Sequence, residues 1–153
     1  MTYRVCKAFE VESGHLLSKH PGRCRFPHGH SRRVEVVLAA QSLDNHDMVV
    51  DFKALKLALS DFLDSFDHAM AVNSQDPRLA QIQSMSERVI VFENEDPTTE
   101  AMARRIFDYL AGKLATGDSF TDEQGNTFAL RPGVTLERVR VSETSSSWAE
   151  YSL

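Results

Sequence analysis

Three histidines and a cysteine are the residues of this sequence whose types and spacing point most directly to chemistry. They are His15, Cys24, His28 and His30. Side chains at i and i+2 on a strand share a face, so the imidazoles of His28 and His30 can approach one ion. His15 ends the preceding strand-like run and could supply a third nitrogen from a neighbouring strand. Three nitrogens with an open fourth position are typical of a catalytic zinc site, whereas a closed structural site would need Cys24 as fourth ligand.

Cys24 has a possible role of its own. It lies between Arg23 and Arg25, and nearby positive charges or a metal favour the thiolate form. A thiolate could act as a general base. The alternative is an inert, partly buried cysteine, which is the better interpretation for Cys6.

Two further groups could join this site. Asp67 precedes His68, and a carboxylate beside a histidine can orient and charge it, although for this pair alone a histidine favoured by the dipole at a helix C-terminus is the better interpretation. Glu143 shares the parity of Val139 and Val141, so its carboxylate points to an apolar face and needs a partner there. A heterocycle with amino and ring N–H donors would satisfy it, as would solvent at the end of a strand.

The charge distribution limits the classes of partner. The net charge of −5 argues against general binding of nucleic acids or acidic membranes. Residues 19–33 nevertheless contain five basic side chains and no acidic one. This excess would attract a phosphorylated substrate, or would simply be solvated. The five are Lys19, Arg23, Arg25, Arg32 and Arg33.

Length and composition predict one domain over residues 1–153, because the chain is long enough to bury a core without disulfides. The sequence contains no apolar run of about 18 residues, the length that would predict a membrane span. Its N-terminal residues lack the apolar stretch of a signal peptide. Cys6 and Cys24 are too few for a disulfide framework, so a reducing cytoplasm is expected.

Two helices are expected to support the candidate residues. The first follows Asp51, a suitable N-cap, and its apolar stripe has helical spacing. The second begins around Thr98, with Glu100 in its first turn, and Gly112 is a candidate for its end. The stripe of the first helix consists of Phe52, Leu55, Leu59, Phe62 and Phe66.

Alternating apolar residues predict strands over residues 3–11, 33–41, 136–144 and 148–153, with a short strand considered at 88–92. Val134 and Leu136 have the opposite parity to Val139, which predicts a β-bulge. The order strand-strand-helix-helix-strand-strand predicts an α+β fold, a four-stranded antiparallel sheet with both helices on one face. Its open edges would pair with neighbouring subunits.

Six motifs occur in order along most of the chain: Phe9 to His15, Cys24-x-x-x-His28-Gly29-His30, Met48-Val49-Val50-Asp51-Phe52-x-x-Leu55-Lys56, Phe66-Asp67-His68, Pro97-Thr98-Thr99-Glu100 and Ser142-Glu143-Thr144. Together they resemble the 6-pyruvoyl-tetrahydropterin synthase family, which includes the 6-carboxy-tetrahydropterin synthases of queuosine biosynthesis. The four-residue step from Cys24 to His28 is similar to the carboxy-forming branch. Segments 69–96 and 112–132 are longer than in the compact bacterial pattern.

The resemblance implies the tunnelling fold, in which subunits with four antiparallel strands and two helices join into an oligomeric barrel, usually a homohexamer. It implies active sites between subunits, so that Cys24 and the pair Asp67 and His68 would come from different chains. The implied roles are zinc (Zn2+) ligation by His15, His28 and His30, general base catalysis by Cys24, a proton relay through Asp67 and His68, pterin anchoring by Glu143, and a pterin pocket near Thr98, Thr99 and Glu100.

The implied substrate is 7,8-dihydroneopterin triphosphate. Elimination of triphosphate and loss of acetaldehyde would give 6-carboxy-5,6,7,8-tetrahydropterin, whereas the other branch would give 6-pyruvoyl-tetrahydropterin. No nicotinamide or flavin is implied.

Three alternatives stay open beside this lyase. One is a dihydropterin lyase, although a glutamate tends to replace the cysteine there. The others are a zinc- or pterin-binding protein without turnover and a zinc-stabilised module that unfolds on chelation.

Overall fold

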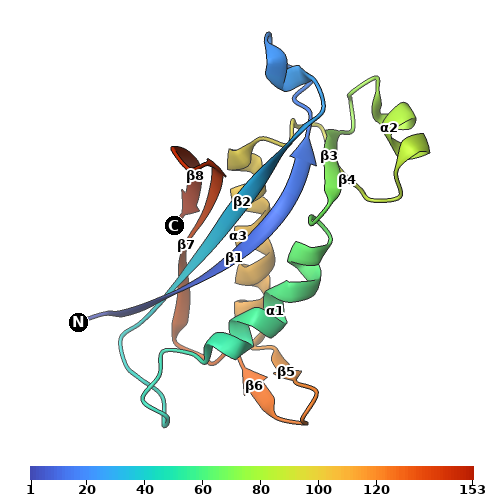
Figure 1. The fold of residues 1–153 in the computed structure, drawn as a ribbon. Coiled ribbons are helices and arrows are strands. Elements are labelled where there is room, and N and C mark those ends of the chain that lie inside the picture. Colours follow the sequence, from blue (N-terminus) through green and yellow to red (C-terminus); the bar gives the residue numbers. More distant parts are fainter.

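The computed structural model describes residues 1–153 and has an α+β architecture built on one twisted, mixed sheet (Figure 1). The strand order in this sheet is β4-β3-β1-β2-β7-β8. Its strands are β1 (Tyr3–His15), β2 (His28–Ala40), β3 (Ala69–Asn73), β4 (Val89–Phe92), β7 (Val134–Thr144) and β8 (Ser147–Ser152), and β5 (Ser119–Thr121) and β6 (Thr127–Ala129) form a separate hairpin. The helices are α1 (Phe52–Asp64), α2 (Leu79–Met85) and α3 (Thr99–Thr116), with a 3-10 turn at Arg23–Arg25.

The prediction of a four-stranded antiparallel sheet with two helices is incomplete. Strands β1, β2, β7 and β8 are antiparallel neighbours as expected. Segment 69–96 adds β3 parallel to β1, β4 parallel to β3, and the short helix α2 between them, so the sheet has six strands and is mixed. The short strand considered at 88–92 is present as β4. Strand β3 is a short apolar run without alternation, which sequence periodicity cannot distinguish from buried helix or loop.

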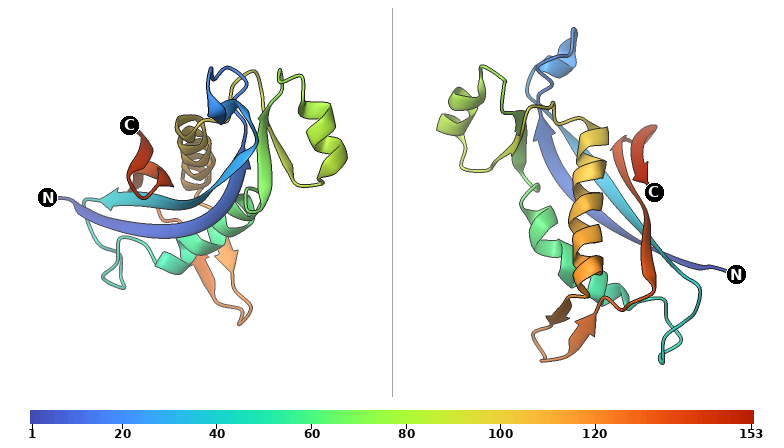
Figure 2. Two further views of the ribbon diagram at one scale, coloured as in Figure 1. Left: turned by 45° about the horizontal axis from the view of Figure 1, so that its top comes forward. Right: turned by 180° about the vertical axis from the view of Figure 1, so that it is seen from behind.

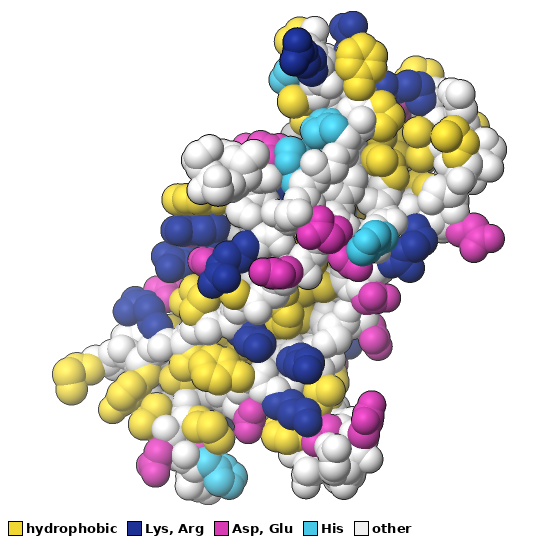
Figure 3. Space-filling view, viewed as in Figure 1, with side chains coloured by type: hydrophobic (Ala, Val, Ile, Leu, Met, Phe, Trp, Pro, Cys, Tyr) yellow, Lys and Arg dark blue, Asp and Glu magenta, His cyan; other side chains and the backbone are white.

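Helices α1 and α3 cover one face of the sheet (Figure 2). The core lies in this layer and contains 25 buried apolar residues. The side of the molecule seen in Figure 3 carries apolar and charged side chains interspersed. None of the helices combines the length and hydrophobicity needed to cross a bilayer.

Helix α1 begins where the sequence predicts. The carboxylate of Asp51 accepts a hydrogen bond from the backbone N–H of Lys53 at 2.8 Å and so caps the helix. Leu55 and Leu59 are fully buried, but Phe52 is 48% exposed. The buried stripe therefore starts one turn later than predicted.

Helix α3 begins as predicted but ends later. The hydroxyl of Thr98 accepts from the N–H of Ala101 at 3.1 Å, which confirms the predicted cap. The helix passes through Gly112 and ends before Gly117, which has a φ of 64°. The prediction that Gly112 ends the helix is wrong, because Leu114 still packs against the core and only Gly117 adopts the left-handed conformation.

Strand β7 contains the predicted irregularity. Leu136, Val139 and Val141 are all buried despite their mixed parity. A register shift in the β2–β7 ladder between Val37 and Leu38 reconciles them. The predicted β-bulge is confirmed, and it allows both halves of β7 to face the same core.

Candidate metal centre

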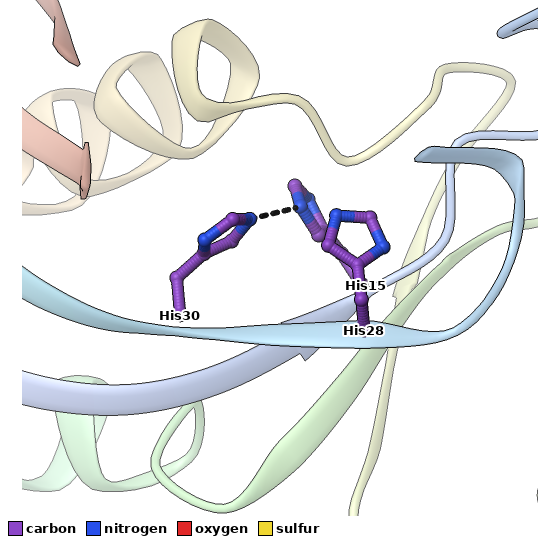
Figure 4. Close-up of side chains that lie close together, drawn as sticks. All are labelled: His15, His28 and His30. Atoms are coloured by element: carbon purple, nitrogen blue, oxygen red, sulfur yellow. Dashed lines mark hydrogen bonds between the residues drawn. The ribbon is translucent and has the colours of Figure 1, made fainter. Parts of the chain in front are cut away.

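The pairing of β1 with β2 brings the three histidines together. The two strands are antiparallel over their whole length, with His15 opposite His28 and Ser13 opposite His30. Directly opposed residues share a face, as do residues two apart on one strand. All three imidazoles therefore project to the same side of the sheet, as Figure 4 shows.

The three rings lie at the distances of a ligand set. Their centroids are separated by 4.5 Å, 5.0 Å and 5.1 Å, and one nitrogen of each lies within 4.8 Å of the others. The Nε2 atoms of His15 and His30 are 3.1 Å apart. The predicted juxtaposition of His15, His28 and His30 is confirmed.

Two ring nitrogens are already engaged with the backbone. Nδ1 of His15 lies 2.7 Å from the carbonyl oxygen of Pro97, and Nδ1 of His28 lies 2.7 Å from that of Phe26. Because a carbonyl only accepts, both Nδ1 atoms carry the proton and both Nε2 atoms carry a lone pair, which in His15 faces Nε2 of His30 at 3.1 Å. This outer hydrogen bond is typical of metal-binding histidines.

The cluster fits a metal ion by the chemistry of these donors. Nε2 of His28 is buried and has no hydrogen-bond partner. An unpartnered buried acceptor is costly, and a cation bound by the three Nε2 atoms would remove that cost. Three imidazole nitrogens suit zinc, and the set leaves a fourth position open.

Burial keeps His15 and His30 in their neutral form. Desolvation lowers the pKa of His15 to about 4, against the favourable effect of its bond to Pro97. The pKa of His30 is also lowered, first by burial and then by the charge of Arg32. Neutral imidazole is the form that binds metals, so at neutral pH protons do not compete for these two sites.

Arg32 lies directly behind the cluster and is only 2% exposed. Its Nε donates to the hydroxyl of Ser13 at 2.8 Å, and its Nη1 donates to the hydroxyl of Thr99 at 3.0 Å. Nη1 also lies 3.3 Å from the carbonyl oxygen of Ser142. Arg32 thus connects β1, the first turn of α3 and β7 around His15.

The expected basic patch does not form as a single surface. Arg32 is buried, and Arg33 points to the opposite face of β2, where it pairs with Glu35 at 2.9 Å. Consecutive strand residues face opposite sides, so a run of charges along a strand is divided between them. Of the five basic residues, Lys19, Arg23 and Arg25 remain exposed in the loop before β2.

Glu143 reaches the cluster from β7. A second register shift, between Ser142 and Thr144, places Glu143 in an irregularity of the β7–β8 ladder. Bulges redirect side chains, and its carboxylate oxygen lies 3.5 Å from Nε2 of His30 and 3.9 Å from Nε2 of His15. The Glu143 carboxylate therefore lies beside the three-histidine cluster.

A cleft of about 320 Å³ next to the cluster collects most of the other candidate residues. The half-buried thiol of Cys24 lines it, and Glu143 forms part of the wall nearest the histidines. The structure therefore brings together residues that are far apart in the sequence. Its lining includes Cys24, Thr98, Thr99, Glu100 and Glu143, together with His20 and Trp148.

Asp67 and His68 lie elsewhere in the same chain. Nδ1 of His68 is 2.7 Å from the Asp67 carboxylate, so the predicted pair is formed. Asp67 also accepts from the backbone N–H of Glu12 at 2.9 Å and lines a different depression, beside Phe9 and Leu63. The side chain of His68 is exposed. A single chain does not bring this pair into the cleft with Cys24.

The sequence reasoning missed three contributors. Arg32 shares the parity of His30 and Val34, and that alternation could have placed it on the buried face. Trp148 and the carbonyl of Pro97 gave no usable signal, because their positions depend on contacts between distant segments.

Fold and site together define an α+β protein with a three-histidine cluster able to hold a metal ion beside a cleft. The sequence model of the 6-pyruvoyl tetrahydropterin synthase family matches residues 4–153. The chain belongs to this family.

Its relatives include two curated bacterial proteins named 6-carboxy-5,6,7,8-tetrahydropterin synthase. That of Aquifex aeolicus is 29% identical over 170 residues and covers 99% of this chain and 98% of its own. That of Rickettsia felis is 29% identical over 119 residues, which cover 76% of this chain and 86% of its own.

Solved structures share the fold. An uncharacterized protein from Wolinella succinogenes aligns with a TM-score of 0.78 at 20% identity, covering 99% of this chain and 98% of that one. The 6-pyruvoyl tetrahydropterin synthase of Plasmodium vivax aligns with a TM-score of 0.69 at 15% identity, covering 99% of this chain and 97% of that one.

Replacing His28 by alanine should weaken zinc binding more than about 100-fold, because loss of even an outer hydrogen-bond partner costs roughly 10- to 100-fold. Competition against a chromophoric chelator measures the affinity. His46→Ala, an exposed turn residue, should bind zinc as the parent does. Equal affinities in the two variants would remove His28 from the ligand set.

The metal-free protein should lose stability as the pH falls from about 6.5 towards 4. Unfolded His15 takes up a proton near pH 6.5, whereas the folded residue does so only near pH 4. The unfolded state thus binds more protons in this interval, and acidification favours it by up to about 3 kcal/mol. Above about pH 6.5, His15 is neutral in both the folded and the unfolded state, so its protonation no longer changes the free energy of unfolding.

Urea unfolding in chelator at several pH values measures this effect. His15→Asn keeps an N–H donor for Pro97 and does not titrate, so it should lose correspondingly less stability over the same interval. Parallel pH curves for parent and variant would contradict the assignment.

Proposed function

We propose that this protein is a zinc-dependent 6-carboxy-5,6,7,8-tetrahydropterin synthase acting on 7,8-dihydroneopterin triphosphate, as in a queuosine-type pathway. The observation that carries the proposal is the three-histidine cluster beside a cleft lined by Cys24 and Glu143. The names of the Aquifex and Rickettsia relatives support the carboxy-forming reaction.

His15, His28 and His30 would hold the zinc through their Nε2 atoms. When bound, the ion would supply Lewis acidity that polarises the hydroxyls of the substrate side chain. The carbonyls of Pro97 and Phe26 keep two of the rings turned towards a common point.

Cys24 would act as the base that moves protons along the substrate side chain. Its thiol is free and half-buried in the cleft, where a reducing cytoplasm would keep it unoxidised. A base must lie within hydrogen-bond reach of the proton it removes, and Cys24 lines the same cleft as Glu143.

Glu143 would anchor the pterin ring. An ionised carboxylate accepts two parallel N–H bonds, and a pterin offers an amino group beside a ring N–H. Thr98, Thr99 and Glu100 line the same cleft and would border the bound ring.

The complete site would form between copies of the chain in a homo-oligomer, with a hexameric barrel as the expected assembly. In this protein Asp67 and His68 are bonded to each other but lie outside the cleft of their own chain. A neighbouring copy would bring this pair to Cys24 as a proton relay. The sheet also has two edge strands, β4 and β8, available for pairing.

Zinc-loaded protein incubated with 7,8-dihydroneopterin triphosphate should release triphosphate and acetaldehyde and form 6-carboxy-tetrahydropterin, identified by mass spectrometry. Cys24→Ala should retain zinc and lose at least about 100-fold in turnover, within the range for a general base. Cys6→Ser, on the exposed sheet face, should keep full activity.

Each other product would change the assignment. Formation of 6-pyruvoyl-tetrahydropterin would move the protein to the other branch of the family. An intact substrate with bound zinc would indicate a binding protein, and full activity of Cys24→Ala would remove the thiol from the mechanism.

Mixing inactive variants tests the shared site. Cys24→Ala and His68→Ala should each be inactive, but subunits exchanged between them should regain activity, because some interfaces would then combine an intact Cys24 with an intact His68. Analytical ultracentrifugation monitors the assembly. Mixtures that assemble into hybrids and stay inactive would contradict a site built from two chains.

A further inference from the structure

Asp96 accepts three hydrogen bonds in a segment next to the three-histidine cluster. It is 8% exposed and directly precedes Pro97. One carboxylate oxygen accepts from the hydroxyl of Ser18 at 2.6 Å and from the amide of Asn73 at 3.0 Å. The other accepts from the backbone N–H of Lys19 at 2.8 Å.

These bonds fix the charge state of Asp96. Burial alone would raise its pKa, but the hydrogen bonds from Ser18, Asn73 and Lys19 outweigh burial and lower the pKa below its usual value. The group is therefore an ionised carboxylate with its acceptors directed at three donors, an arrangement stronger than neutral hydrogen bonds.

Ser18 and Lys19 belong to the loop that carries Cys24. The backbone N–H of Leu17 donates to the carbonyl of Cys24 at 2.9 Å. This bond joins the two ends of the loop next to Ser18 and Lys19, the residues that Asp96 holds. A displacement of residues 18 and 19 would be passed to Cys24 through that closure. Figure 2 shows the loop between β1 and β2 beside the segment that enters α3.

The residues after Asp96 contact the other parts of the site. The carbonyl of Pro97 accepts from His15, and Thr98 caps α3 and lines the cleft with Cys24. Three consecutive residues therefore reach three parts of the site: Asp96 bonds to the Cys24 loop, Pro97 to the imidazole of His15, and Thr98 lines the cleft. Asp96 is the member of this segment that reaches the Cys24 loop by its side chain.

We propose that Asp96 is a positioning residue for Cys24, holding the 16–27 loop so that the thiol keeps a fixed place relative to the three-histidine cluster. The inference rests on the proposed role of Cys24 in pterin chemistry. Its physical basis is that a base displaced by about 1 Å can lose roughly 100-fold in rate even when the substrate still binds.

Asp96→Asn is the sharpest substitution. It preserves size, but the amide can keep its oxygen towards Ser18 and Asn73 only by turning its NH2 group towards the N–H of Lys19. That places two donors face to face and releases the loop on one side.

A matched control lies in the same region. Asp76 is 3% exposed and ionised like Asp96, but its side chain bonds to Arg78 instead of the Cys24 loop. Asp76→Asn therefore removes a buried carboxylate that is paired with Arg78 and makes no hydrogen bond to residues 16–27.

The experiment measures the alkylation rate of Cys24 by iodoacetamide in a Cys6→Ser background, where Cys24 is the remaining thiol. Steady-state turnover, zinc content and the melting temperature are measured on the same zinc-loaded samples. Asp96→Asn should alkylate about 10-fold faster than the parent and lose roughly 10- to 100-fold in kcat, with KM changed less than about 3-fold. Asp76→Asn should match the parent in alkylation and kcat whatever its melting temperature.

An unchanged alkylation rate in folded Asp96→Asn would overturn the proposal. Equal effects in both aspartate variants would also overturn it, since they would reflect general loosening. If Asp96→Asn fails to fold, Ser18→Ala removes one bond from the loop side and should shift alkylation and kcat in the same direction by a smaller factor; parental values there would reject the role. If the parent protein shows no turnover, the proposed function is refuted. The alkylation rates of Cys24 in the parent and in Asp96→Asn would still decide the role of Asp96.

Discussion

The candidate site depends on the register of one pair of strands. Because His15 opposes His28 and Ser13 opposes His30 in an uninterrupted antiparallel ladder, three imidazoles converge without any special loop geometry. A slip of one residue would turn His28 and His30 to the opposite face. The same alternation continues into Val34 and Val36, which are fully buried. The hydrophobic core therefore fixes the strand register that brings the three histidines together.

The polar groups behind the cluster explain how its rings are held. Nδ1 of His15 donates to Pro97, so the approach of the Arg32 guanidinium to that nitrogen at 3.4 Å is a contact of two donors rather than a hydrogen bond. Burying such a charge is costly, and burial lowers the pKa of Arg32. Its bonds to Ser13 and Thr99 offset part of this cost, and they join β1 to the start of α3 beside His15.

Segment 69–96 contributes to the site as well as to the size of the sheet. Strand β3 pairs with the last three residues of β1, with His15 opposite Ala71. The chain then returns through β4 to Pro97, whose carbonyl oxygen accepts a hydrogen bond from Nδ1 of the same imidazole. His15 is therefore held between β3, at the start of this segment, and Pro97, which directly follows it, and both contacts contribute to its burial.

The sequence by itself determined the features that depend on neighbours along the chain. The His-x-His spacing, the caps at Asp51 and Thr98 and the β-bulge of β7 all follow from local periodicity and local hydrogen bonding, and each is present. The family followed from the order of the motifs. Only the tertiary structure decided that Arg32 is buried, that α3 continues through Gly112, and that β3 and β4 pair in parallel to extend the sheet. It also decided that Asp67 and His68 lie outside the cleft of their own chain. The physical reason is that these outcomes depend on which distant segments pack together, and a pattern of near neighbours carries no record of that packing.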